Sequence, residues 1–149
     1  MRKLNYKIEI KAPKDKVYQN LIGKETFKQW TSEFHPTSDF EGSWEKGEEI
    51  RLIGYAEDGK KEGMLALIEE NMPNELISIR HYGVIDGENE IFEGPKVEAW
   101  APAYEIYTLS QEMEITHLAV EVDAADENME YFDKTWPKAL NKLKDISES

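Results

Sequence analysis

Apolar residues at a helical spacing mark the C-terminal end of the chain. From Asp126 to Ile146 they recur at steps of three or four, and most intervening positions are polar or charged. The apolar positions are Met129, Phe132, Trp136, Leu140 and Leu143. Because this spacing places them on one face, it predicts a long amphipathic helix with that face buried. Pro137 lies inside the pattern and cannot donate to the carbonyl of Asp133, so we expect the helix to bend or restart there.

Alternation with a period of two marks the other end. Apolar residues from Leu4 to Ile10 are separated one by one by polar residues, which predicts a half-buried strand. After Ala12-Pro13 we expect two short helices, one ending at Gly23 and one carrying Phe27 and Trp30. From Ser38 onward, turn signals separate alternating runs, which indicates antiparallel strands joined by hairpins. The main expected strands are Glu49 to Ala56, Gly63 to Glu70, Leu76 to Ile85, Tyr104 to Ser110 and Met113 to Asp123.

One connection, from Gly83 to Ala103, has little periodicity although it contains Ile91, Phe92, Val97 and Trp100. A structureless stretch near 20 residues is uncommon within a domain, so two interpretations remain open. It is either a lid over a cavity, or extended strand ends followed by a short helix from Lys96 to Trp100.

The order of elements predicts the fold class. A strand, two short helices, about six meandering strands and a long helix indicate an α+β fold, with helices on one face of a seven-stranded, curved antiparallel sheet. The length of 149 residues matches one domain, so we expect a single domain over residues 1–149.

Charge narrows the classes of partner. The net charge is −13 and the chain has no cluster of basic residues, which argues against nucleic acid and against an anionic membrane surface. The longest apolar runs are only a few residues, so no membrane insertion is expected. The first residues enter the alternating strand directly, without an apolar signal core, which predicts a cytoplasmic protein. With no cysteine, disulfides and thiolate chemistry are excluded.

Catalytic and cofactor motifs are missing from the sequence. It has no GxSxG, P-loop or dinucleotide fingerprint, so we assign no catalytic residue and expect no cofactor. The histidines are His35, His81 and His117. In a meander, the Tyr104 to Ser110 strand separates His81 from His117 by about 10 Å, too far to share one metal ion. A general acid and base cannot be picked from 31 carboxylates, so an enzymatic role stays open.

Four motifs in order resemble one superfamily. They are Ala12-Pro13 with Val17-Tyr18, Leu21 and Trp30; Phe40-Glu41-Gly42-Ser43-Trp44 with Gly47; Gly63-Met64-Leu65 with Met72-Pro73 and Leu76; and Trp136-Pro137 with Leu140 and Leu143. Over nearly the whole chain, the sequence is similar to the START-related (SRPBCC) superfamily of the birch-pollen allergen. Within it, the sequence resembles the branch of the activator of heat-shock protein 90 ATPase.

The resemblance implies a helix-grip fold, in which a curved sheet wraps around the last helix and leaves a cavity. Relatives use such a cavity to bind sterols, lipids, aromatic polyketides or plant hormones, which implies non-covalent binding of a small hydrophobic or amphipathic ligand. Two alternatives are a protein-interaction module that engages a chaperone, and an aromatase/cyclase-like enzyme. The chain is shorter than a full-length lipid-transfer START domain and lacks the additional domain of the eukaryotic activator.

Residues at the expected interface of sheet and last helix are the candidate ligand contacts, since ligand cavities are mostly apolar with few polar groups. The candidates are Trp30, Phe40, Arg80, Tyr82, Trp100, Thr108, Thr116, Leu118, Phe132 and Trp136. Arg80 shares a strand side with Leu76 and Ser78, so it either points into the cavity or pairs with surface acids. The threonines either orient a ligand or reflect the preference of threonine for strands.

Overall fold

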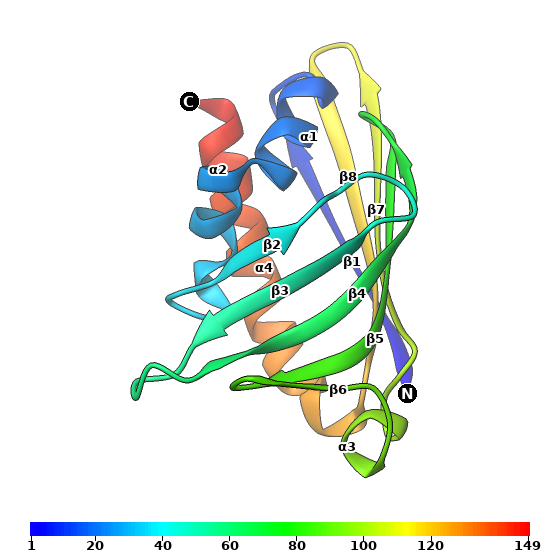
Figure 1. Cartoon of the computed structure of the whole chain (residues 1–149). Helices are drawn as coiled ribbons and strands as arrows, with labels where there is room; N and C mark the ends of the chain where they lie inside the picture. Colours follow the sequence, from blue (N-terminus) through cyan, green and yellow to red (C-terminus); the bar gives the residue numbers. More distant parts are fainter.

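A computed structural model describes all residues, 1–149, as an antiparallel sheet curved around one long helix (Figure 1). The strands are β1 (Arg2–Ile10), β2 (Asp39–Gly42), β3 (Glu49–Tyr55), β4 (Lys61–Met72), β5 (Leu76–Asp86), β6 (Asn89–Ile91), β7 (Ala103–Glu112) and β8 (Ile115–Ala124). They are ordered β1-β8-β7-β5-β4-β3-β2, and β6 pairs with β5 beside this path. The predicted α+β helix-grip fold is confirmed, with one short strand more than expected.

The chain has four helices, of which the short α3 (Pro95–Glu98) lies beside β5 while the others gather on the concave side of the sheet (Figure 1). These others are α1 (Lys14–Ile22), α2 (Lys24–Trp30) and α4 (Met129–Glu148), with 3₁₀ turns at Thr31–Glu33 and Asp126–Asn128. Helix α4 therefore begins three residues later than expected. It continues through the exposed Pro137 without a break, so the expected restart there is wrong.

The connection from Gly83 to Ala103 contains the end of β5, then β6, then α3. Extended strand ends followed by a short helix describe it better than a structureless lid. The helix begins at Pro95, one residue before the expected Lys96, and ends at Glu98. Pro95 suits its first turn because a residue at that position has no intrahelical N–H bond to make.

One large core lies between the sheet and helices α1, α2 and α4. Trp136, Leu140 and Leu143 of α4 are buried in it, as the helical spacing predicts, whereas Met129 and Phe132 are only half-buried. Trp30 on α2 is 1% exposed and its indole donates to the carbonyl of Leu21 at 3.1 Å. Burying each such side chain contributes roughly 1.5–3 kcal/mol, so this core holds α4 against the sheet.

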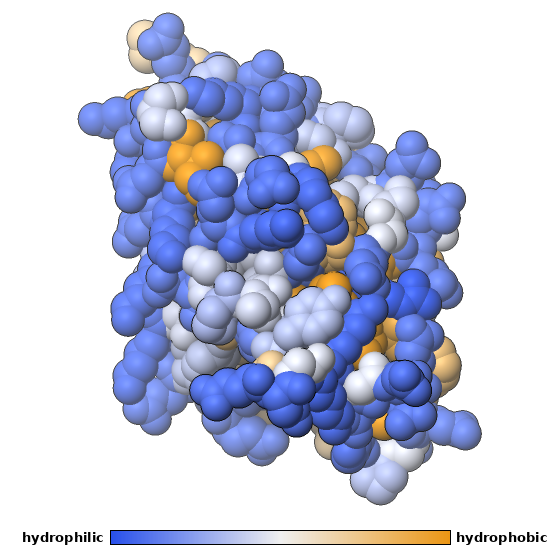
Figure 2. Space-filling view, turned by 60° about the vertical axis from the view of Figure 1, so that its left-hand side comes forward, coloured by the Kyte–Doolittle hydropathy of each residue, from blue (hydrophilic) through white to orange (hydrophobic).

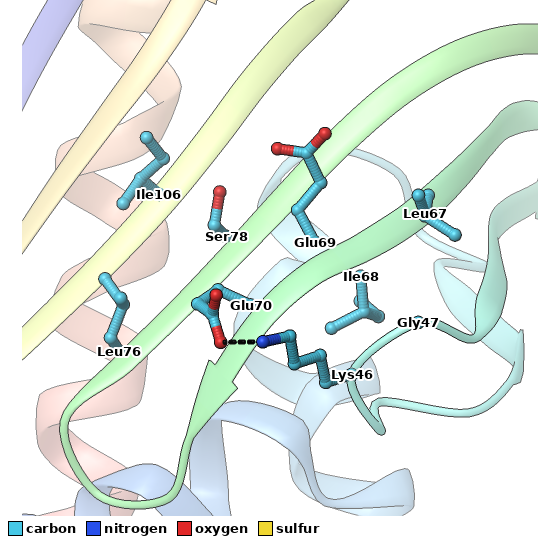
Figure 3. A pocket seen from close by; sticks show the side chains of 9 residues that line it. All are labelled: Lys46, Gly47, Leu67, Ile68, Glu69, Glu70, Leu76, Ser78 and Ile106. Atoms are coloured by element: carbon cyan, nitrogen blue, oxygen red, sulfur yellow. Dashed lines mark ion pairs between the residues drawn. The ribbon is translucent and has the colours of Figure 1, made fainter.

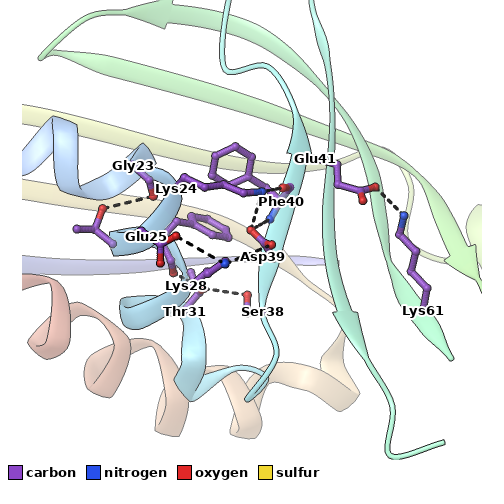
Figure 4. Close-up of polar contacts among 12 residues, drawn as sticks. Gly23, Lys24, Glu25, Lys28, Thr31, Ser38, Asp39, Phe40, Glu41 and Lys61 are labelled. Carbon is purple, nitrogen blue, oxygen red and sulfur yellow. Dashed lines mark hydrogen bonds and ion pairs between the residues drawn. The ribbon is translucent and has the colours of Figure 1, made fainter. Parts of the chain in front are cut away.

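Polar contacts attach β2 to α2 (Figure 4). Lys24 lies 2.9 Å from the Asp39 carboxylate, and its ammonium sits 4.5 Å from the centre of the Phe40 ring. Below them, Thr31 donates to Ser38 at 2.8 Å. A short edge strand is thereby joined to the helical layer by ionic, cation–π and hydroxyl contacts.

The surface is dominated by charge. Figure 2 shows a face on which hydrophilic residues cover most of the area and hydrophobic residues form small, separate patches. No helix combines the length and the low polarity needed to cross a bilayer.

Candidate functional site

A cavity of about 800 Å³ lies between the concave face of the sheet and the helices. Its buried wall includes Trp30 from α2, Tyr107 from β7 and Trp136 from α4. Its exposed rim includes Lys60 from the β3–β4 hairpin and Tyr131 from the first turn of α4. The cavity therefore joins a buried aromatic interior to the end of the molecule where α4 begins.

Aromatic rings around Trp136 form the inner wall. The ring of Phe34 packs edge-on against this indole with centroids 4.9 Å apart. Trp30 and Tyr107 lie 6.3 and 6.2 Å from it. Edge-on and tilted arrangements at these distances are favourable, because the positive edge of one ring meets the negative face of another.

A polar cluster interrupts this apolar wall. The Nε2 atom of His81 on β5 lies 3.0 Å from Oε1 of Glu105 on β7. The hydroxyl of Tyr107, two residues further along β7, donates a short hydrogen bond to the other oxygen of the same carboxylate. All three residues line the cavity.

Sheet register explains why these residues meet. In the antiparallel pair of β5 and β7, Ile79 is opposite Glu105 and His81 is opposite Ala103. His81 and Glu105 are therefore diagonal neighbours on one face, within reach of long side chains. Alternation then places Tyr107 on the same face as Glu105.

Burial keeps the Tyr107 phenol of this cluster protonated. Loss of solvent raises the pKa of the Tyr107 phenol well above its ordinary value of 10.0, and the negative charge of Glu105 raises it further. Tyr107 is therefore a hydrogen-bond donor at all physiological pH values. The His81 and Glu105 side chains are 5% and 16% exposed, so their contact is shielded from water.

Opposite charges pair at the rim. Asp86 contacts the ammonium group of Lys60, and that of Lys96 lies 3.5 Å away. The hydrogen bond from Lys60 lowers the pKa of the Asp86 carboxyl. Glu62 is the register partner of Asp86 across β4 and β5, and His35 Nε2 lies 3.2 Å from the Glu62 carboxylate. The entrance is thus polar although much of the interior is apolar.

The structure brings four of the predicted contacts to this cavity: Trp30, Trp100, Phe132 and Trp136. Phe40 and Leu118 belong to the core and do not line the cavity. Thr116 is fully buried and donates to the carbonyl of Ala12 at 2.6 Å, whereas Thr108 is exposed.

Of the two orientations left open for Arg80, the one toward the cavity is wrong. On β5, Ile77, Ile79 and His81 are buried on the concave side, so Arg80 lies on the convex side. Its Nε atom is 2.7 Å from the Glu69 carboxylate, the surface pairing that was the alternative.

Tyr82 is also away from the cavity lining. Its ring stacks on Phe92 at 6.0 Å, and its hydroxyl donates to Glu49 at 3.2 Å. It packs against a second small core of Ile53, Leu65 and Ile85. Burial alternates regularly along β5, so Tyr82 shares the less buried side of this strand with Ser78 and Arg80.

Sequence reasoning missed Glu105 and Tyr107, and considered His81 only as a metal ligand. One signal was available, since Ile77 and Ile79 alternate with Ser78 and Arg80. Apolar residues mark the buried face, and that face includes His81. The pairing with Glu105 depends on the register of β5 against β7, which this pattern does not encode.

The three histidines lie apart. Strand β7 separates His81 on β5 from His117 on β8, as expected. The structure has no group of three His, Cys, Asp or Glu side chains arranged as metal ligands.

A second hollow, of about 570 Å³, lies on the convex face of the sheet (Figure 3). Leu67, Leu76 and Ile106 line it, and the ion pair of Lys46 and Glu70 (3.0 Å) crosses one end. It is smaller than the concave cavity and has no histidine or aromatic residue. We therefore take the concave cavity as the candidate site.

Similarity to solved structures agrees with this fold. The solution structure of the Aha1 dimer from Colwellia psychrerythraea is 23% identical, with a TM-score of 0.71, and the match covers 99% of this chain and 97% of that one. A Nitrosomonas europaea protein is 16% identical, with a TM-score of 0.73 and coverages of 97% and 92%. CalU16 from Micromonospora echinospora is 16% identical, with a TM-score of 0.67 and coverages of 99% and 76%. At these identities the likeness concerns the fold.

The sequence itself matches a family model. Residues 11–148 match the model described as Activator of Hsp90 ATPase homolog 1-like protein, whereas no curated protein matches the chain. This match covers nearly the whole sequence and agrees with the resemblance seen in its motifs. The chain therefore belongs to the Activator of Hsp90 ATPase homolog 1-like family, within the SRPBCC superfamily.

Proposed function

We propose that this protein binds a small hydrophobic or amphipathic molecule, without covalent chemistry, in the concave cavity. The observation that carries the proposal is a space of about 800 Å³ with a buried aromatic wall. Ligand pockets typically measure about 300–1,000 Å³ and are largely apolar with a few polar groups. We place this activity in the cytoplasm.

The ligand contacts we propose are the aromatic residues already at the cavity. Trp30 and Trp136 are buried in its inner wall, while Phe132 and Trp100 are half-buried and lie nearer to solvent. Rigid rings lose little conformational entropy when they pack against a ligand. The apolar body of the ligand would lie among these four side chains.

Native mass spectrometry before and after organic extraction tests the proposal. We expect a non-covalent mass that leaves on extraction, and a lower melting temperature of the extracted protein. Adding back a ligand at 100 times its Kd stabilises by about 2.7 kcal/mol. For a chain of this size that corresponds to roughly 5–10 °C. No retained mass, together with no stabilisation by fatty acids, sterols or flavonoids, would overturn the proposal.

A matched pair of variants on β7 tests whether the ligand binds in the concave cavity. Ala103→Leu adds three carbons to a buried residue that lines the cavity, and should displace the ligand. Thr108→Leu adds a similar apolar side chain to the exposed face of the same strand and should leave binding unchanged. Equal effects of the two variants would place the ligand elsewhere.

Engagement of a chaperone is a second candidate, favoured by the family match over residues 11–148. In this case the protein would bind an Hsp90-type chaperone and stimulate its ATPase. The test is a pull-down with the purified chaperone combined with an ATPase measurement. Absence of both binding and stimulation argues against this function.

An aromatase/cyclase-like activity is a third candidate, favoured by ionisable groups inside the cavity. Such chemistry needs a buried group with a perturbed pKa, and Tyr107 is one. Incubation with a model polyketide chain, followed by mass and absorbance analysis, would detect cyclisation. An unchanged substrate argues against this function and leaves the binding proposal intact.

A further inference from the structure

Two residues that line the cavity each have a buried side-chain nitrogen without a hydrogen-bond partner in the protein: Nδ1 of His81 and Nε1 of Trp136. Each residue is only 4% exposed. Leaving such a group unsatisfied is unfavourable, and native proteins have few of them. Both atoms therefore indicate what a bound molecule must offer.

Glu105 determines whether Nδ1 of His81 donates or accepts a hydrogen bond. Its carboxylate accepts from the Tyr107 hydroxyl on one oxygen and lies 3.0 Å from His81 Nε2 on the other. An ionised carboxylate only accepts, so Nε2 must carry the hydrogen. In neutral His81 this leaves a lone pair on Nδ1, which makes that atom an acceptor.

The indole nitrogen of Trp136 is a hydrogen-bond donor, in contrast to Nδ1 of His81. Trp136 Nε1–H is a donor only, and it needs an oxygen or nitrogen acceptor. The residues that line the cavity therefore include one unpaired acceptor and one unpaired donor among aromatic side chains. The Glu105 charge next to His81 makes this part of the wall unfavourable for an anionic group, which favours a neutral polar group on the ligand.

We propose that the cavity selects molecules with a hydroxyl group on an apolar body: the hydroxyl donates to His81 Nδ1, and a ligand oxygen accepts from Trp136 Nε1. This inference rests on the proposed binding function and names the chemistry of the ligand. Glu105 and Tyr107 act as positioning residues, because they hold the imidazole in the accepting tautomer without contacting the ligand themselves.

Titration calorimetry with two probes of similar shape tests this proposal. 2-Naphthol has a hydroxyl donor, and 2-methoxynaphthalene has an ether oxygen that accepts but cannot donate. We expect the wild-type protein to bind 2-naphthol about tenfold more tightly, as one hydrogen bond to a buried, otherwise unpaired atom allows. In His81→Phe that preference should vanish, while the affinity for 2-methoxynaphthalene stays within about threefold.

His117→Phe is the matched control, because that imidazole lies outside the cavity lining and its side chain is 40% exposed. It should keep the tenfold preference. If the wild type binds both probes equally, the hydroxyl inference is overturned while the binding function stands. If neither probe binds and no mass is retained on purification, the binding function itself fails, and the inference fails with it.

A measurement on the wild type covers the case in which His81→Phe does not fold. In protein labelled with ¹⁵N-histidine, 2-naphthol should move the His81 Nδ1 resonance upfield, as expected for a nitrogen that accepts a hydrogen bond, and 2-methoxynaphthalene should not. If the Nδ1 chemical shift does not change when 2-naphthol binds, the inference is overturned. A co-purified ligand without any O–H group overturns it as well.

Discussion

The indole of Trp136 on α4 stacks on the phenol ring of Tyr6 on β1, with centroids 5.9 Å apart and 15° between the planes. The Tyr6 hydroxyl also donates to Asp133 of α4 at 2.6 Å. The first strand and the last helix are thereby joined through one aromatic pair and one hydrogen bond. This contact holds the edge strand β1 against α4.

Trp136→Ala should therefore be strongly destabilising. Removing a buried tryptophan typically costs about 3–5 kcal/mol in the free energy of unfolding, through lost burial and the cavity left behind. Urea denaturation followed by circular dichroism measures this value. Lys138→Ala, an exposed change on the same helix, should stay within about 0.5 kcal/mol. A loss below about 1 kcal/mol for Trp136→Ala would contradict this role.

Two threonine substitutions compare the stability cost at a buried, hydrogen-bonded position with that at an exposed position. Thr116→Val removes the donor to the Ala12 carbonyl while keeping the shape of the side chain, and should cost about 1–3 kcal/mol. Thr108→Val alters an exposed position on the neighbouring strand β7 and should change stability by less than about 0.5 kcal/mol. Thermal unfolding of both variants provides the comparison. Equal effects would show that the buried hydroxyl is not the cause.

The raised pKa of Tyr107 leads us to expect a loss of stability at alkaline pH. Its pKa in the folded protein is well above 10.0, so near pH 10 only the unfolded chain releases this proton, and the free energy of unfolding falls as the pH rises further. At pH 11 the titration of this group lowers the free energy of unfolding by about 1.4 kcal/mol. Tyr6 acts in the same direction because burial and Asp133 raise its pKa too.

Tyr107→Phe isolates one of these contributions. Urea midpoints between pH 8 and 11 should fall less steeply for Tyr107→Phe than for the wild type, although the variant is less stable at pH 8 because Glu105 loses a donor. Parallel curves for the two proteins would show that Tyr107 does not titrate on unfolding in this range.

Arg80→Leu should leave ligand binding unchanged. The guanidinium lies on the convex face and pairs with Glu69, whose side chain is 38% exposed. Exposed ion pairs contribute about 0–1 kcal/mol, so stability should also change little. Calorimetry with 2-naphthol should give an affinity within about twofold of the wild type. A tenfold loss would indicate that Arg80 reaches the ligand after all.

Local patterns predicted most of the fold. Alternation from Leu4 to Ile10 and helical spacing along α4 identified the two elements that Trp136 and Tyr6 join. Each of these patterns repeats over several turns or strand residues, so it specifies an element and its buried face without knowledge of its neighbours. Expected strand ends differ from the observed ones by up to two residues, because pairing partners decide where a strand stops.

The candidate site was predicted only in part. Trp30, Phe132 and Trp136 were found because large aromatic residues on a buried face tend to meet at the interface of two layers. The side of Arg80 stayed open, since its neighbours Ser78 and Leu76 were ambiguous. The isoleucines that resolve this ambiguity point to His81 instead.

The sequence by itself determined the α+β class, the amphipathic last helix and the family of this protein. Only the tertiary structure decided that His81, Glu105 and Tyr107 share one wall, and that Nδ1 of this histidine is left without a partner. Residues 24 positions apart become neighbours through the register of two strands. Register depends on how the buried faces of two whole strands match, so neither strand alone specifies which side chains meet across the cavity wall.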